Sequence, residues 1–216
     1  MTTGRVTVID VSEPLGDEAA ARTWLDRAGE EELAAGLAVI NRALHAYRIV
    51  TADPYLHEIG REQALVARLG YGAGDEVADG RWSEARELAP ALGSRRRSAI
   101  LEPQARLAAA LNGRQRILAC EELALRARSD ADHGRDREAA LQLLVALDAA
   151  LAELALDPGA ESLADRLAEL RGRREGVVAA AQSALAGPLD DAARTAVLET
   201  LGRLEAALRA RAAVSG

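Results

Sequence analysis

The feature that most constrains the fold is a helical spacing of apolar residues, interrupted by proline. Prolines stand where this spacing stops or starts, at Pro14, Pro54, Pro90, Pro103, Pro158 and Pro188. Apolar residues three or four positions apart lie on one face of an α-helix, and proline opens or ends a helix. The pattern predicts a mainly α-helical fold of helical bundles or hairpins.

Two segments predict a small β element beside the helices. Residues 5–11 are rich in β-branched side chains and predict a short N-terminal strand. Residues 64–88 contain two short apolar runs around a glycine-rich stretch, which predicts a possible hairpin. Helices are expected at residues 17–28 and 30–50, and the longer one carries an apolar stripe of Leu33, Leu37, Ile40, Leu44 and Tyr47.

Charge and aromatic content divide the chain into two regions. Residues 1–93 carry 16 acidic and 9 basic side chains, whereas the remainder is balanced, and nothing after Trp82 is aromatic. We therefore expect an acidic N-terminal region of mixed helix and minor strand over 1–93, an arginine-rich linker over 94–102, and an all-helical region over 103–216. That last region is expected to hold helices at about 103–111, 115–131, 136–155, 161–185 and 190–212.

Missing residue types exclude several kinds of chemistry. All 27 basic residues are arginine, so the chain lacks the lysine amine of Walker-type phosphate loops, protein kinases and Schiff-base enzymes. Cys120 is the only cysteine, which excludes an internal disulfide and cysteine-built metal centres. His57-Glu58 begins a zinc-binding H-E-x-x-H pattern, but Arg61 occupies the second histidine position. We expect no metal, no cofactor and no assignable catalytic residue, and the sequence leaves open whether the chain is an enzyme, leaning against it.

The candidate ligand site lies in residues 41–82. Asn41, His45 and Arg48 share one face of the 30–50 helix. Tyr55, His57 and Arg61 follow after the next turn, and two arginines beside histidines could bind a small anion. The alternative is that these side chains are solvated faces and helix caps.

The last two predicted helices suggest a protein-binding surface. Val197, Leu201, Leu204 and Leu208 recur at heptad-like spacing on the last helix, and we expect them to pack within the 161–212 hairpin or to bind a partner. A self-associating chain, as a dimer, is one form of this expectation.

One segment resembles a known repeat. Over about 123–157, Ala127, Gly134, Ala139, Leu143, Ala146 and Leu147 stand at the spacing of the small and apolar positions of a single tetratricopeptide hairpin, and the expected helical hairpin spans 115–155. The resemblance implies peptide or protein binding. No second copy follows at the repeat's period of about 34 residues.

The preferred functional hypothesis is a non-catalytic helical protein that binds another protein or itself. The alternatives are a regulatory protein or enzyme with an anion site in 41–82, and a nucleic-acid accessory protein using Arg95, Arg96 and Arg97. No apolar run reaches the roughly 20 residues of a membrane span, and the N-terminus lacks the apolar core of a signal peptide. We expect a cytoplasmic protein without membrane contact.

Overall fold

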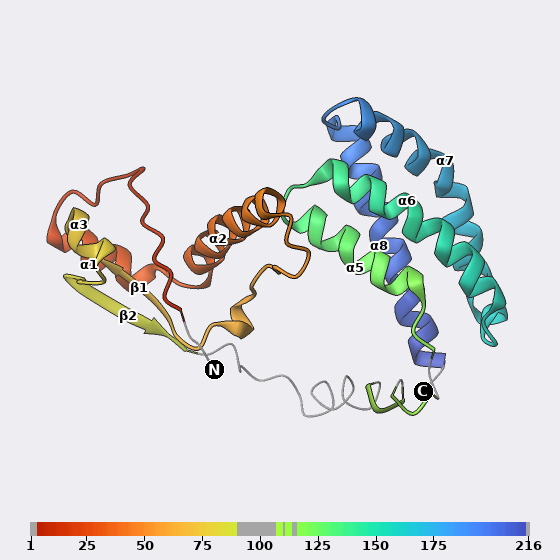
Figure 1. Cartoon of the computed structure of the whole chain (residues 1–216), viewed down its shortest axis with the longest axis horizontal. Helices are drawn as coiled ribbons and strands as arrows, with labels where there is room; N and C mark the ends of the chain where they lie inside the picture. Colours follow the sequence, from red (N-terminus) through yellow and green to blue (C-terminus); the bar gives the residue numbers. More distant parts are fainter. Residues whose placement is uncertain (1–3, 90–106, 110, 114–115, 215–216) are drawn as a thin grey trace. The chain divides into compact units, whose positions relative to one another are not determined.

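The computed structural model describes residues 4–89, 107–109, 111–113 and 116–214. The chain divides into two compact units, Met1–Arg95 and Arg96–Gly216 (Figure 1). Helices predominate in both, and the strands in the described residues form a two-stranded sheet. The predicted mainly α-helical fold with a small β element is confirmed. The expected 94–102 linker and most of the expected 103–111 helix lie outside the described residues.

The described residues of the first unit form three α-helices and a hairpin. Helix α1 spans Glu18–Arg27 and α2 spans Glu30–Thr51, with a short α3 at Gly74–Ala78 and a 3₁₀ turn at Arg61–Gln63. Strand β1 (Ala67–Tyr71) pairs antiparallel with β2 (Glu84–Leu88), and α3 lies in the connection between them. The predicted hairpin is therefore present. Its buried apolar contacts come from α1, the hairpin and α3: Ala21, Leu25, Ala28, Ala67, Val77 and Leu88.

The predicted N-terminal strand is wrong. Residues 5–11 have no strand structure, and Val6 and Val11 are 66% and 85% exposed. β-branched residues favour an extended backbone, but a strand also needs a neighbour that completes its hydrogen-bond ladder. Strands β1 and β2 pair with each other, and Arg5 of the segment donates a side-chain hydrogen bond to the Asp79 carbonyl.

The second unit is a four-helix bundle. Helices α5 (Ala119–Asp132), α6 (Asp136–Glu153), α7 (Ala164–Ala186) and α8 (Asp191–Val214) follow one another. Short 3₁₀ turns at Leu154–Leu156 and Ala160–Leu163 connect α6 to α7. Helix α6 packs on α5 and α7, and α8 contacts all three of the others. The 115–131, 136–155, 161–185 and 190–212 predictions thus correspond to these four helices.

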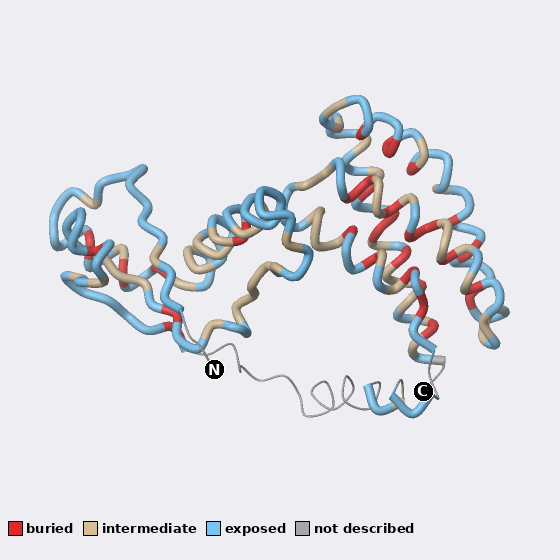
Figure 2. The backbone as a smooth tube through the Cα atoms, in the orientation of Figure 1, coloured by how far each residue is buried: buried red, intermediate tan, exposed pale blue. Residues whose placement is uncertain are grey.

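The bundle has a continuous core of leucine and alanine, which Figure 2 shows as buried segments along all four helices. The fully buried large side chains include Leu143, Leu147, Leu154, Leu163, Leu170, Leu201 and Leu204. The segment Asp136–Leu156 is apolar and long enough to cross a membrane by length and composition, with a mean hydropathy of 1.8. Its buried side chains belong to the core of the bundle, as expected for the central helix of a folded domain.

Candidate interaction surface

Asn41 of the predicted ligand site is a structural residue. It is 5% exposed, and its side-chain amide donates to the Ile59 carbonyl at 3.0 Å while its oxygen accepts from the Ile59 amide at 2.9 Å. These two bonds join the segment after α2 back to the middle of that helix. Pairing both backbone groups of one residue satisfies polar atoms that burial would otherwise penalise.

Arg61 also makes structural contacts. Its guanidinium donates to the Ala89 carbonyl at 2.8 Å, and its Nε lies 3.8 Å from Oε2 of Glu30. The latter distance is that of an ion pair and is too long for a hydrogen bond. Arg61 therefore connects the 3₁₀ turn, the end of β2 and the start of α2.

The other four residues of the predicted ligand site do not form a polar cluster. His45 is half-buried, whereas Arg48, Tyr55 and His57 are exposed. No hydrogen bond or ion pair joins these four side chains to one another in this described segment. Likewise, no group of three or more His, Cys, Asp and Glu in the described residues could hold a metal ion.

The predicted partner-binding residues of α8 lie in the bundle core. Val197, Leu201 and Leu204 are at most 2% exposed, and Leu208 packs partly buried against them. The prediction of an exposed partner-binding surface on these residues is therefore wrong. Their spacing matches the packing of α8 against α5, α6 and α7. Arg95, Arg96 and Arg97, predicted to contact nucleic acid, lie outside the described residues.

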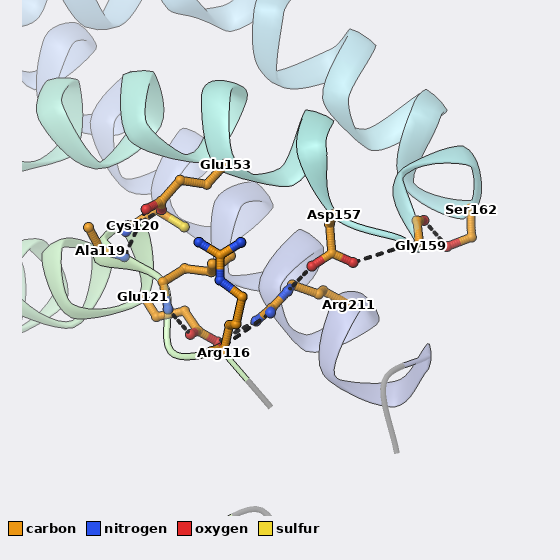
Figure 3. A network of polar contacts seen from close by, with 10 residues as sticks. Arg116, Ala119, Cys120, Glu121, Glu153, Asp157, Gly159, Ser162 and Arg211 are labelled. Carbon is orange, nitrogen blue, oxygen red and sulfur yellow. Dashed lines mark hydrogen bonds and ion pairs between the residues drawn. The ribbon is translucent and has the colours of Figure 1, made fainter. Parts of the chain in front are cut away.

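A buried arginine joins three helix ends in the second unit (Figure 3). Arg211 of α8 is 4% exposed. Its Nε donates to Asp157 at 2.7 Å, its Nη2 donates to the Arg116 carbonyl at 3.0 Å, and its Nη1 lies 3.4 Å from Glu121. These partners come from the segment before α5, from α5 itself and from the turn after α6. The network stabilises one end of the bundle.

Glu153, at the end of α6, caps the start of α5. Its carboxylate accepts from the Ala119 and Cys120 amides at 3.1 and 2.9 Å. These are among the amides that a helix N-terminus leaves without an internal partner. Sequence reasoning missed this cap because the two residues lie far apart in the chain.

The pKa shifts in this network indicate a structural role for its side chains. The hydrogen bond from Arg211 is the main cause that lowers the pKa of Asp157. Burial, assisted by Glu153, raises the pKa of Cys120 to about 12. A thiol with so high a pKa stays protonated at neutral pH and is a poor nucleophile.

A shallow depression of about 430 Å³ lies between α7 and α8. Its lining includes Arg173, Glu199 and Arg203. Arg173 lies 3.4 Å from Glu199, and Arg203 lies 3.2 Å from Glu169. Because the arginines are already paired with carboxylates, the depression has no free charge with which to select a ligand.

Among the described residues of the first unit, more large apolar side chains are exposed than are buried. The large exposed apolar residues among its described positions, here called the N-terminal apolar set, are Val6, Val8, Ile9, Val11, Val39, Tyr47, Ile49, Val50, Tyr55, Leu65 and Val66. Its buried apolar side chains larger than alanine are Leu25, Val77 and Leu88. The predicted α2 stripe is half-buried at its leucines, and Tyr47 at its end is 61% exposed.

Comparison with known protein families, with curated proteins and with solved structures found no significant match. The helical hairpin formed by α5 and α6 has its small residues buried, as Ala127 and Ala139 show. Its resemblance to a tetratricopeptide repeat stays a prediction.

Proposed function

We propose that this chain is a non-catalytic protein-interaction protein that binds through its N-terminal unit. The observation that carries the proposal is the N-terminal apolar set, which lies on a unit whose own core is small. Apolar side chains left in water favour association with a partner that covers them. The four-helix bundle, in contrast, has a continuous core of buried leucine and alanine.

The architecture of the first unit supports this proposal. Its sheet has two strands, and a hairpin of this size depends on the helices that pack against it, here mainly α1. Helix α2 is 22 residues long, yet its one buried residue is Asn41. Most helices gain their stability from tertiary packing. A partner that covers α2 would therefore supply the apolar packing that the first unit lacks. The alternatives expected from the sequence, an anion site and a nucleic-acid accessory role, stay predictions.

The test is the assembly state of the full chain with charges placed on this surface. Ile49→Glu combined with Val50→Glu changes two residues that are 64% and 84% exposed. We expect the wild-type chain to form a complex in native mass spectrometry and sedimentation, and the double variant to lose it without loss of helix content.

The matched control places two glutamates on the bundle. Leu125→Glu with Leu185→Glu changes residues that are 67% and 70% exposed, and we expect this variant to assemble normally. A wild-type chain that is monomeric throughout the micromolar range and carries no other protein would overturn the proposal. Loss of assembly in the control variant alone would indicate that the interaction surface lies on the second unit.

A further inference from the structure

Helix α2 presents an exposed line of two alanines, flanked by an acidic residue in its first turn and a basic residue near its middle. The residues Glu31, Ala35, Ala38 and Arg42 follow at spacings of four, three and four, which places them in one line along the helix. All four are exposed. Val39 lies beside this line, and Ile49 continues it toward the end of the helix, with exposures of 43% and 64%.

Within the described part of the chain, the two charges on this face have no hydrogen bond or ion pair, whereas the acidic residues beside Glu31 do. Glu30 lies 3.8 Å from Arg61, and Glu32 accepts from the Gly29 amide at 2.6 Å. Neither Glu31 nor Arg42 has a side-chain hydrogen bond or an ion pair with any residue that the structure describes. An apolar face that carries two unpaired and opposite charges is suited to a surface of complementary charge.

We propose that the partner of α2 is α2 of a second copy of this chain, packed antiparallel. The line Glu31, Ala35, Ala38, Arg42 is symmetric about the point between positions 36 and 37. An antiparallel copy centred there places Glu31 opposite Arg42 twice, and Ala35 opposite Ala38 twice. Such a contact is isologous, as a two-fold dimer requires. This inference deepens the proposed function and rests on it.

The opposite orientation is unfavourable. A parallel pair in register would bring Glu30, Glu31 and Glu32 of both copies to the same end and would align the two helix dipoles. Like charges at close range oppose association, and antiparallel dipoles are favoured over parallel ones. Antiparallel packing separates the two acidic ends and brings Arg42 of each copy to the acidic end of the other.

Packing on this face fits the same register. Val39 falls opposite Ala34 of the other copy, so that a larger side chain meets a small one, and both are exposed in the single chain. Alanines allow two helix axes to approach closely, which increases dispersion contacts. In this register Leu44 falls opposite Gly29 of the other copy, so Ile49 and Val50 extend past the start of its α2.

Charge reversal tests the pairing. Glu31→Arg places two arginines opposite each other at both ends of the interface, and Arg42→Glu does the same with two glutamates. We expect each single variant to weaken the dimer about tenfold or more in sedimentation equilibrium. The double variant Glu31→Arg with Arg42→Glu exchanges the charges and is expected to restore wild-type affinity to within about threefold.

The control for the reversal is Glu138→Arg. Glu138 is exposed in the first turn of α6, so this change has the same effect on a helix dipole without touching α2. We expect its dimer affinity to equal that of the wild type.

Disulfide trapping gives a second, independent readout. Glu31 and Arg42 are about 16 Å apart along one helix, given the rise per residue, and the native Cys120 is fully buried. A mixture of Glu31→Cys and Arg42→Cys chains is expected to form a mixed disulfide dimer, because the antiparallel register brings the two thiols together. Each variant alone is expected to remain uncrosslinked.

The outcomes separate this inference from the proposed function. A wild-type dimer that is insensitive to charge reversal, or Glu31→Cys chains that crosslink to themselves, would overturn the antiparallel pairing and leave an interaction function. A complex of the wild-type chain with a different protein would also overturn it. A strictly monomeric chain without any partner would overturn both.

Discussion

At the residue scale, the buried polar side chains decide which contacts this fold must keep. Asn41 pairs with both backbone groups of Ile59, and Arg211 holds Asp157 inside the bundle. Removing one member of such a pair leaves the other buried without a partner, and this costs more than an exposed ion pair contributes. We therefore expect the stability of the fold to constrain these residues.

Asp157 should control part of the acid stability of the bundle. Its pKa is lower in the folded chain than in the unfolded chain, so its stabilising contribution is present above about pH 4 and is lost as the pH falls through the folded pKa. We expect Asp157→Asn to lower the free energy of unfolding at pH 7 by about 2 kcal/mol. We also expect its unfolding free energy to fall less steeply than that of the wild type below about pH 4.

Denaturant unfolding followed by circular dichroism between acidic and neutral pH measures both effects. Asp148→Asn is the control, because Asp148 pairs with Arg174 where both side chains are close to half exposed. Such a pair is expected to contribute less than about 1 kcal/mol. If the free energy of unfolding of Asp157→Asn and of the wild type fell equally at acidic pH, the buried position of Arg211 would not depend on this carboxylate.

At the element scale, the effect of replacing a glycine depends on whether it lies inside a helix or in a turn between two helices. Gly134, between α5 and α6, has a φ of +68°, which favours glycine over any other residue. Gly176 lies exposed within α7, and a Cβ added there would meet no atom within 4 Å. The same substitution should therefore have opposite effects at these two positions.

We expect Gly176→Ala to raise the free energy of unfolding by about 0.5–1 kcal/mol and Gly134→Ala to lower it by about 1 kcal/mol. The gain at Gly176 comes from a reduced entropy of the unfolded chain, and the loss at Gly134 comes from backbone strain. Thermal and denaturant unfolding of the two variants provide the comparison. A loss of stability in Gly176→Ala would mean that α7 is covered at that position.

The helical elements could be predicted because their apolar spacing is local. The buried residues Leu143 and Leu147 of α6 lie four positions apart, and such spacing needs no knowledge of the rest of the chain. The predicted strand over 5–11 failed because strand formation depends on a distant partner. Leu201 and Leu204 could not be assigned from sequence either, since core packing within one chain and packing between chains use the same spacing.

The candidate surface was only partly accessible to sequence reasoning. Asn41, His45 and Arg48 attract attention as polar residues on one helix face, yet Asn41 turns inward to Ile59. The sequence feature on which the proposed surface depends is the symmetric line of Glu31, Ala35, Ala38 and Arg42 along α2. Its interpretation required knowing that Glu30 and Glu32 are occupied elsewhere, which comes from tertiary contacts.

At the scale of the whole molecule, the two units differ in how complete their cores are. The bundle buries apolar side chains from all four helices, whereas the first unit buries three apolar side chains larger than alanine among its described residues. Folding stability follows the apolar surface removed from water. The two units are therefore expected to unfold separately, with the first unit less stable.

Dimerisation should make the stability of the first unit depend on protein concentration. A partner that binds the folded form stabilises it by mass action. We expect amide hydrogen exchange in α2 to slow as the chain is concentrated, and exchange in α6 to remain unchanged. Equal protection of α2 at all concentrations would argue against a partner on this helix.

The N-terminal apolar set also has a consequence for the lifetime of the protein in a cell. Exposed apolar side chains on a marginally stable unit are features that chaperones and proteases act on. A chain that has assembled through α2 covers part of this surface, and a chain that has not remains open to degradation. Under the proposed pairing, copies made in excess of the assembled form would be removed first, so assembly itself would set how much of the protein accumulates.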